Sequence, residues 1–254
     1  MFPAERRQSI LTMVRANGAV SIHELAKLTG TSEVTVRRDL RQLEADGQLT
    51  RHHGGAVMVG GGTAHEPSYT EKAHVAADEK SAIADAAVSL VEDGDAVIIG
   101  AGTTTQAFAR RLTRFRELTV VTNSLPAAQV LSRARGVEVF VTGGHLRGSI
   151  NALVGGQAEQ ALAGMRTPKA FMSGNGLTVD HGLSTPNILV ANIDRAIAAA
   201  AREVIVLADH TKIGQDTMVQ TVPTAHISVL VTDGMAPADQ LDGFREAGVR
   251  VIVA

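Results

Sequence analysis

Arginine and hydroxyl side chains gather on one short segment near the amino terminus. On a helical wheel of residues 32–44, Val36, Leu40 and Leu43 form an apolar stripe, and the opposite side is polar. Guanidinium groups bind guanine edges and phosphates, while hydroxyls and a helix amino terminus bind the phosphate backbone. The segment therefore has the chemistry of a helix that reads DNA, with candidate contacts from Ser32, Thr35, Arg38, Arg41 and Gln42.

Glycines and hydroxyl side chains in the second part of the chain are suited to an anionic ligand. In AVIIGAGTTTQAFARRL, residues 96–112, glycines let backbone N–H groups approach a ligand at a helix start, where the dipole favours phosphate. A plain tight turn explains one such junction equally well. A second polar junction, VVTNSLP, follows the next strand, and two on one rim favour binding. The candidates are Gly102, Thr103, Thr104, Thr122, Asn123 and Ser124.

A carboxylate and two lysines add charge to this group. Asp209 and Lys212 come directly after a buried strand in VLADHTKIG, and Lys80 lies at the start of a helix. A lysine neutralises a phosphate as a point charge, and a carboxylate accepts hydrogen bonds from sugar hydroxyls. The alternatives are a surface ion pair of little energetic value for Asp209 and Lys212, and a solvated Lys80.

Several other chemistries are excluded or disfavoured. The chain has 254 residues and no cysteine, which excludes disulfides, thiolate metal sites and a cysteine nucleophile. Among nine histidines only His52 and His53 are adjacent, and neighbouring strand residues point to opposite faces, so no metal site is expected. No apolar run reaches the ~18 residues of a membrane span. With no signal peptide recognisable, we expect a cytoplasmic protein.

The elements that position the arginines can be predicted from caps and periodicity. Residues 1–50 predict three short helices, with Ser21 and Ser32 as the N-caps of the second and third and Gly30 ending the second. The glycine-rich run that follows predicts a two-stranded wing with its tip near 52–55, and Arg51 on this wing reaches a groove or phosphate. Charges that only solvate a surface helix are the alternative, which the combination of turn, caps and wing disfavours.

The distribution of charge agrees with this division. The formal net charge is −2, but residues 1–56 hold eight Lys and Arg against six Asp and Glu, and the remainder holds 16 against 20. A small basic excess at the amino end supports nucleic-acid binding but does not establish it alone.

The second part predicts an α/β fold, Rossmann-like, with a parallel sheet covered on both faces. Short β-branched runs at 96–100, 118–122, 137–144, 170–174, 203–209, 226–233 and 249–254 are separated mostly by helical segments. The binding site of such a sheet lies at the carboxyl ends of its strands. Three consecutive glycines and a proline lie before the first of these helical and strand segments, which predicts a linker at 58–72. The linker separates a small winged helix-turn-helix domain at 1–57 from a larger domain at 73–254.

The stretch from Arg6 to Ala56 resembles the DeoR-type winged helix-turn-helix of bacterial transcription regulators. The matching elements are TVRRDL, LEADG and RHHGGA. The resemblance implies binding to double-stranded operator DNA, with Ser32, Thr35, Arg37, Arg38, Arg51 and His52 near the DNA. The helical wheel instead turns Arg37 sideways, where it has Glu33 within reach.

The remainder resembles the DeoR-type effector domain, which is related to sugar-phosphate isomerases such as ribose-5-phosphate isomerase. The resemblance runs through GAGTTT, VVTNS, VTGGHLR, LVGGQAEQAL, GNGLTVDHGLSTPN and VLADHTKIG. It implies a phosphorylated sugar as effector. The phosphate loop is then Gly102, Thr103 and Thr104, with Lys80, Thr122, Asn123, Ser124, Asp209 and Lys212 around the sugar.

Three positions depart from that family's pattern. Gly100 and Val190 stand where the family commonly has acidic residues, and Lys72 stands where it often has arginine. Two missing carboxylates remove acceptors for sugar hydroxyls and candidates for acid–base catalysis.

We therefore predict a sequence-specific transcriptional repressor of carbohydrate metabolism genes that a phosphorylated sugar releases from its operator. It is expected to be a homo-oligomer, a dimer or tetramer, with no cofactor and no catalytic residues. The alternatives are a sugar-phosphate isomerase-like enzyme with an appended DNA-binding module, and a protein that coats DNA without regard to sequence.

Overall fold

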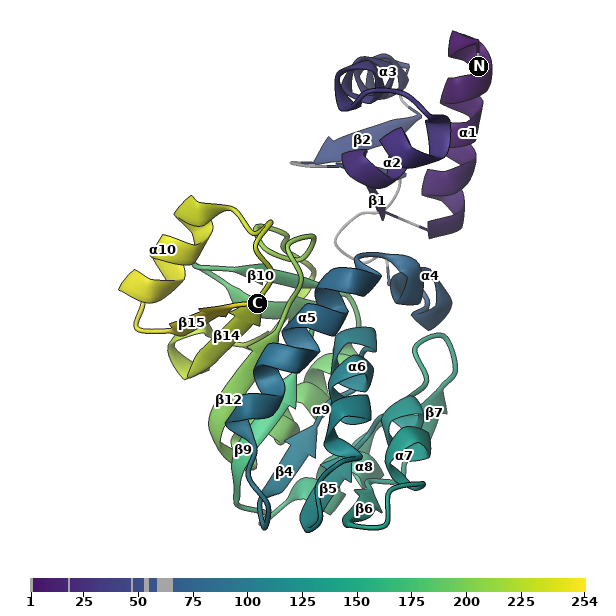
Figure 1. Ribbon diagram of the computed structural model, residues 1–254. Coiled ribbons are helices and arrows are strands. Elements are labelled where there is room, and N and C mark those ends of the chain that lie inside the picture. Colours follow the sequence, from purple (N-terminus) through teal and green to yellow (C-terminus); the bar gives the residue numbers. More distant parts are fainter. Residues whose placement is uncertain (1, 18, 47, 53–54, 59–65) are drawn as a thin grey trace. The chain divides into compact units, whose positions relative to one another are not determined.

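The chain divides into two compact units, unit 1 at residues 1–75 and unit 2 at residues 76–254. The computed structural model describes residues 2–17, 19–46, 48–52, 55–58 and 66–254 (Figure 1).

Unit 1 contains the three predicted helices, α1 (Pro3–Asn17), α2 (Ile22–Thr29) and α3 (Glu33–Ala45). Both predicted N-caps are confirmed. The Ser21 hydroxyl accepts the backbone N–H of Glu24, whose carboxylate returns to the Ser21 N–H, and Ser32 accepts the N–H of Thr35. Gly30 ends α2 at a φ of 63°, in the left-handed region that favours glycine.

The wing belongs to a three-stranded antiparallel sheet in the order β1 (Ala19–Ser21), β3 (Gly55–Met58), β2 (Leu49–His52). The sequence predicts the β2–β3 hairpin but not β1, because three residues carry no periodic signal. A Cβ at Gly55 would lie 2.4 Å from the carbonyl oxygen of Val20, so this close approach of β1 requires glycine. The predicted tip at His53 and Gly54 lies outside the described residues.

The core of unit 1 forms where α1, α2 and α3 meet the sheet. The predicted stripe of Val36, Leu40 and Leu43 is buried in this core. Beside it, the Arg6 guanidinium of α1 forms an ion pair with the Asp39 carboxylate of α3, and a second hydrogen bond joins Arg6 Nη2 to Asp39 Oδ1 at 3.3 Å. The hydrogen bond that Arg6 donates to Asp39 outweighs burial and raises the pKa of Arg6. The pair links the two helices.

Part of the segment predicted as an irregular linker is helical. Helix α4 (Tyr69–His74) begins at Ser68, whose hydroxyl accepts the N–H of Glu71 while the Glu71 carboxylate accepts the N–H of Ser68. This capping box satisfies two backbone donors in a run that the sequence analysis reads only as glycine- and proline-rich.

The predicted parallel sheet of unit 2 is confirmed. Seven strands lie in the order β15-β14-β12-β9-β4-β5-β6, and every neighbouring pair is parallel. Numbered along the chain, this is the doubly wound order 3-2-1-4-5 with two further strands. The strands are β4 (Ala96–Ile99), β5 (Leu118–Thr122), β6 (Val137–Val141), β9 (Thr167–Met172), β12 (Ala201–Leu207), β14 (Val229–Thr232) and β15 (Arg250–Val253).

Helices cover both faces of this sheet (Figure 1). Along β9, Phe171 joins one apolar core and Met172 the other, as alternate strand residues must. Phe171 packs on Phe108 of α6 with ring centroids 4.3 Å apart. One face carries α5 (Ala77–Ala87), α6 (Thr103–Leu112) and α7 (Leu125–Leu131); the other carries α8 (Gly156–Leu162), α9 (Ile188–Ala199) and α10 (Ala238–Glu246).

Two small antiparallel sheets were not predicted. Their strands are three or four residues long, too short for a clear pattern in the sequence. One pairs β7 (His145–Arg147) with β8 (Ala152–Val154), and the other has the order β10 (Gly176–Thr178), β11 (Gly182–Thr185), β13 (Val219–Val222). Short 3-10 turns at Val88–Leu90 and Thr224–His226 complete the unit.

The Arg6–Asp39 pair is expected to hold α3 in place. Asp39→Ala leaves a guanidinium without its carboxylate at the helix interface, so we expect faster amide exchange in α1 and α3 and an unfolding midpoint for unit 1 that is several degrees lower. Hydrogen-exchange mass spectrometry of the full chain measures this. Glu33→Gln is the control, because it alters only the exposed contacts of Glu33 with Arg37 and His23 and should change little. Equal protection of α1 and α3 in Asp39→Ala and in wild type would contradict the assignment.

Candidate DNA-reading and effector sites

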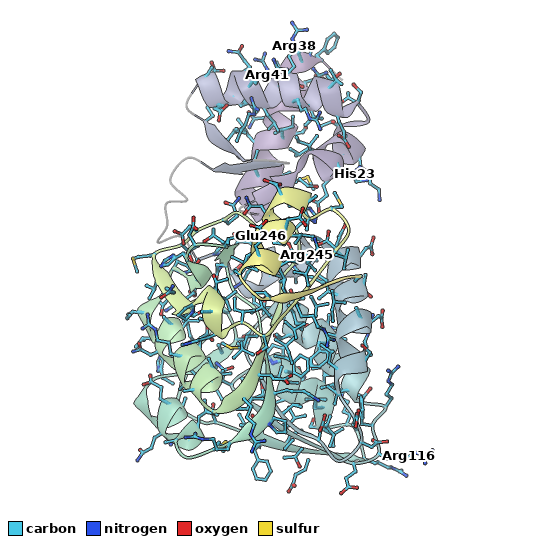
Figure 2. All side chains as sticks on the ribbon, turned by 90° about the vertical axis from the view of Figure 1, so that its left-hand side faces the viewer. His23, Arg38, Arg41, Arg116, Arg245 and Glu246 are labelled. Atoms are coloured by element: carbon cyan, nitrogen blue, oxygen red, sulfur yellow. The ribbon has the colours of Figure 1, made fainter. Side chains whose placement is uncertain are left out.

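Burial of its apolar stripe turns the opposite face of α3 to solvent. Arg37, Arg38, Arg41 and Gln42 are all exposed there. Figure 2 shows Arg38 and Arg41 projecting outward from the helix. The structure therefore brings together on one surface the four α3 side chains that the sequence analysis proposes for DNA contacts.

These four side chains differ in how they are engaged within unit 1. Arg37 forms an ion pair with Glu33 at 3.3 Å, as the helical wheel indicates, and Gln42 donates to Asp46 at 3.0 Å. Arg41 donates through Nε to the backbone carbonyl of Arg37 at 3.3 Å. Among the residues that the structure describes, the Arg38 guanidinium has no hydrogen-bond or ion-pair partner. Arg38 is therefore the side chain with all its donors available to a partner.

The remaining predicted DNA contacts have structural roles as well. The Ser32 hydroxyl caps α3, and it lies 3.0 Å from the hydroxyl of Thr35. Arg51 on β2 lies 3.6 Å from the Glu44 carboxylate, which also accepts the Arg51 backbone N–H at 3.0 Å. The backbone of His52 belongs to β2, and its side chain lies outside what the structure describes. The wing is thus tied to α3 through Glu44.

In unit 2 the order of the strands reverses between β4 and β9. The loops that follow these two strands meet, because a Cβ at Gly102 would lie 3.3 Å from the Cβ of Ser173. In open parallel sheets, ligands bind outside the carboxyl ends of the strands at such a reversal.

Helix α6 starts at this reversal with its backbone donors uncapped. Gly102 is the N-cap and contributes no side chain, and no side-chain hydrogen bond caps the helix start. Thr105 is buried and donates to the Gly102 carbonyl at 3.1 Å, and Thr104 is buried as well. Thr103 is partly exposed, so its hydroxyl is the accessible one of the three.

The next junction, between β5 and α7, is largely occupied by its own hydrogen bonds. Thr122 donates to the carbonyl of Ile99 at 2.7 Å and accepts the N–H of Ser124 at 3.0 Å. Ser124 caps α7 through the N–H of Ala127 at 3.3 Å. These two hydroxyls therefore hold the loop in shape instead of remaining free for a ligand.

Asn123 differs from its two neighbours. Its amide donates to the carbonyl of Leu153 at 3.1 Å, while its buried Oδ1 has no hydrogen-bond donor among the described residues. A buried acceptor without a donor is uncommon in folded proteins, so Asn123 Oδ1 has the capacity to accept a hydrogen bond from a bound molecule.

Asp209 repeats this pattern at the end of β12. Its Oδ1 accepts the N–H of Thr211 at 3.1 Å, and its buried Oδ2 lies 4.0 Å from Lys80 Nζ without a hydrogen bond. Both side chains are at most 5% exposed, so the predicted alternative of a solvated Lys80 is wrong. Lys80 is carried to this position by α5, whereas Lys212 stays half-buried in the Asp209 loop.

The loop that carries Asp209 and Lys212 is held by the small sheet. The N–H of Leu177 in β10 donates to the Lys212 carbonyl at 2.9 Å, and Gly214 donates back to the Leu177 carbonyl at 2.8 Å. These bonds fix both charged residues at the carboxyl edge of the parallel sheet.

A histidine–aspartate pair at the same edge was missed by the sequence analysis. His210 Nδ1 lies 3.0 Å from Asp233 Oδ1, and the His210 backbone N–H donates to Asp233 Oδ2 at 2.8 Å. Burial lowers the pKa of His210, but the hydrogen bond and charge of Asp233 outweigh it, so that pKa lies above 6.5. Burial raises the pKa of Asp233, and its hydrogen bonds bring it below 3.8. The residues are 23 apart, so no local motif joins them.

Gly100 and Val190, the two positions without the family's carboxylate, have apolar side chains as neighbours. Val190 in the first turn of α9 packs against the core. A Cβ at Gly100 would lie 3.8 Å from Ile197 Cδ1 of the same helix. Lys72, the third departure, lies in α4 of unit 1. No acidic side chain therefore stands at position 100 or 190.

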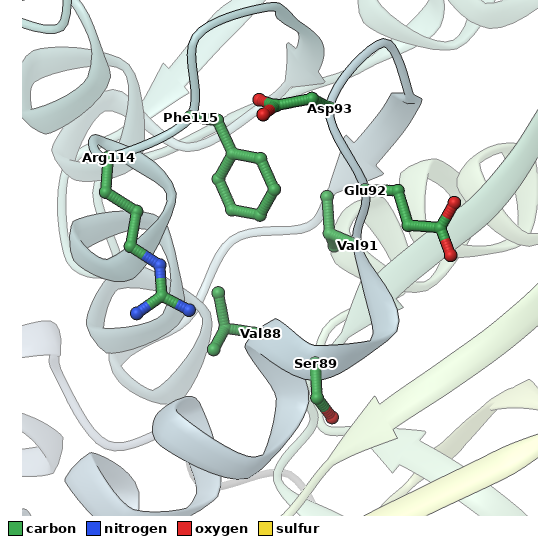
Figure 3. A pocket seen from close by; sticks show the side chains of 7 residues that line it. All are labelled: Val88, Ser89, Val91, Glu92, Asp93, Arg114 and Phe115. Carbon is green, nitrogen blue, oxygen red and sulfur yellow. The ribbon is translucent and has the colours of Figure 1, made fainter.

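A hollow of about 520 Å³ lies at the amino ends of strands β4 and β5, opposite the proposed effector residues (Figure 3). Its lining comes from the segments that precede β4 and β5, and the Phe115 ring turns toward Val88 and Val91. The predicted effector residues are absent from this lining, which consists of Val88, Ser89, Val91, Glu92, Asp93, Arg114 and Phe115.

Neither a metal-binding cluster nor a membrane-spanning helix is present in the described ranges. No three of their His, Asp and Glu side chains gather in a way that suits a metal ion. Within the same ranges, none of the helices has both the length and the apolar character that crossing a membrane requires.

Comparison with known proteins identifies both units. The profile of the DeoR-like helix-turn-helix domain matches residues 6–60, and that of the DeoR C terminal sensor domain matches residues 75–234. The HTH-type transcriptional regulator GlpR of Haloferax volcanii is 36% identical, over 99% of this chain and 98% of GlpR. The HTH-type transcriptional repressor GlcR of Bacillus subtilis is 32% identical, over 100% of this chain and 97% of GlcR.

Among solved structures, ribose 5-phosphate isomerase A from Methanocaldococcus jannaschii is 18% identical with a TM-score of 0.41, covering 54% of this chain and 55% of that chain. At this TM-score the likeness carries no weight, and the assignment depends on the two profiles and the full-length relatives.

The His210–Asp233 pair predicts a pH dependence of stability. A raised folded pKa means that His210 contributes fully below its unfolded pKa of about 6.5 and loses that contribution as pH rises through the folded value. Asp233, with a lowered pKa, contributes above about 3.9. The deficit of Asp233→Asn in free energy of unfolding should therefore be largest between about pH 4 and 6.5 and shrink above it.

Chemical unfolding across this pH range and imidazole NMR titration check this expectation. Imidazole NMR titration should give His210 a pKa above 6.5 in wild type and a lower one in Asp233→Asn. Asp216→Asn is the control, because it alters the more exposed His181–Asp216 pair and should affect stability less. A deficit that stays constant from pH 5 to 9 would show that the pair does not titrate as described.

Proposed function

The chain belongs to the DeoR family of helix-turn-helix transcriptional regulators, and we propose that a phosphorylated sugar bound by unit 2 releases unit 1 from its operator. Its full-length relatives are transcriptional regulators and not enzymes, so the alternative of an isomerase-like enzyme is set aside. The regulated genes are proposed to serve carbohydrate metabolism.

The proposed DNA contact places α3 in the major groove. Arg38 supports this role, because its unengaged guanidinium can donate two hydrogen bonds to the edge of a guanine. Arg41 and the amino terminus of α3 at Ser32 and Thr35 then contact phosphates, and Arg51 on the wing contacts the backbone beside them. Arg37 and Gln42 are bound to Glu33 and Asp46 within the protein. They contact DNA only if their contacts with DNA are stronger than these.

The proposed effector site lies at the reversal of strand order in unit 2. One observation carries it: two buried acceptors, Asn123 Oδ1 and Asp209 Oδ2, have no hydrogen-bond donor at the carboxyl ends of β5 and β12. Sugar hydroxyls supply the donors that both atoms lack. The uncapped start of α6 at Gly102, with the Thr103 hydroxyl, suits the phosphate, and Lys80 and Lys212 supply positive charge nearby.

Release requires the effector to bind the weakly DNA-bound state better than the tightly bound one, because equal affinity shifts no equilibrium. A tenfold loss of operator affinity needs only about 1.4 kcal/mol of coupling. One winged domain buries little DNA surface, so the proposal includes a homo-oligomer, a dimer or tetramer, whose paired domains bind two half-sites.

Arg38→Ala tests the DNA contact. We expect its affinity for an operator selected from random duplexes to fall by about 1–3 kcal/mol, and its affinity for random DNA to fall less, at one fixed salt concentration. The control is Arg116→Ala, which removes the same charge from an exposed site in unit 2 (Figure 2). Equal losses of affinity for the operator and for random DNA would show that Arg38 contacts phosphate. If the wild-type protein binds every duplex with the same affinity, the proposed regulatory function is wrong.

Thr103→Val tests the effector site. The change keeps the shape of the side chain and removes its hydroxyl, so DNA binding should persist while sugar phosphates no longer release the operator. The measurement is operator binding across a panel of sugar phosphates, with the unphosphorylated sugars beside it. Thr113→Val, at the far end of α6, is the matched control and should respond as wild type does. Undiminished release in Thr103→Val would show that the phosphate is bound elsewhere.

A further inference from the structure

A large apolar side chain stands on the basic face of α3. Val34 is 70% exposed, although the core of unit 1 buries Val36, Leu40 and Leu43 of the same helix. At 3.6 residues per turn, Val34 lies ~200° around the helix from Val36. It therefore occupies the middle of the exposed face, and no core contact accounts for it.

Neither packing nor helix formation explains a valine at this position. A β-branched residue loses side-chain freedom in a helix, and a solvated helix position is better served by alanine, glutamate or lysine. The neighbours of Val34 along the exposed face are Arg38, four residues on, and Arg41, seven residues on. These three side chains form one ridge, because residues four apart stack along a helix.

We propose that Val34 reads the C5-methyl group of a thymine in the operator. This inference rests on the proposal that α3 enters the major groove. In that groove the thymine methyl is the apolar feature of a base edge, and apolar side chains contact it. An apolar side chain next to guanidinium groups matches a methyl beside guanine acceptors and phosphates.

The ridge also predicts where the thymine lies. Side chains at positions i and i+4 of a helix are about 5–6 Å apart at Cβ, and successive base pairs are about 3.4 Å apart. The thymine contacted by Val34 therefore lies within two base pairs of the guanine contacted by Arg38. Each half-site carries the same thymine, because identical subunits bind identical half-sites.

The test compares thymine with deoxyuridine in the operator. Deoxyuridine keeps base pairing and lacks only the methyl group, so each thymine of a half-site is replaced in turn in the selected operator. The full-length protein is measured by titration at one salt concentration. Wild type should lose about four-fold in affinity per half-site at one thymine next to the Arg38 guanine, and Val34→Ala should bind both duplexes equally.

Controls separate this contact from folding and from the proposed function. Val34→Ala should unfold at or slightly above the wild-type temperature, because the side chain is exposed and alanine favours the helix, and it should bind random DNA as wild type does. Val253→Ala is the matched control, a valine 46% exposed in β15, and should keep the deoxyuridine penalty. Arg38→Ala, run on the same duplexes, reports whether α3 reads bases at all.

Three results would overturn the inference. They are a selected operator with no thymine within two base pairs of the Arg38 guanine, no deoxyuridine penalty in wild type, and an undiminished penalty in Val34→Ala. If Arg38→Ala still weakens operator binding in these cases, base reading by α3 stands and only the role of Val34 fails. If Arg38→Ala has no effect, the proposed DNA contact fails with it.

Discussion

Parallel pairing of β4, β9 and β12 is the constraint on which the effector site depends. Each strand is buried on both faces, so successive residues enter opposite cores, as Phe171 and Met172 do. Crossover helices return the chain so that every strand runs the same way, and all carboxyl ends meet at one edge. Segments as distant in sequence as Gly102, Asn123 and Asp209 are brought to that edge together.

The same edge is where unit 2 leaves polar groups incompletely satisfied. Its loops use most of their donors and acceptors to hold themselves, as Thr122 and Ser124 do. The exceptions among the described residues are Asn123 Oδ1, Asp209 Oδ2 and Thr232 Oγ1, each of which gives up the stabilisation of about 1–3 kcal/mol that a partner would supply. A ligand that donates to them recovers this free energy on binding.

The exposed face of α3 in unit 1 also carries side chains without partners among the residues that the structure describes. Burial of Val36, Leu40 and Leu43 decides which face of α3 meets solvent, and the Arg6–Asp39 pair links that helix to α1. Several polar side chains on the exposed face already have partners in the protein. The Arg38 donors and the Val34 methyl groups do not, so the face combines unused hydrogen-bonding capacity with exposed apolar surface.

The sequence by itself determined the first three helices of unit 1, the caps at Ser21 and Ser32, the seven strands of the parallel sheet in unit 2 with most of the helices between them, and the family. These depend on local chemistry, on periodicity over ten or more residues, or on contiguous motifs. Only the tertiary structure decided that β1 joins the wing, that Asp39 meets Arg6, and that His210 meets Asp233. It also decided which hydroxyls at the sheet edge are already engaged. Such pairings join residues that are far apart in the chain, and three-residue strands leave no pattern, so their partners are set by packing alone.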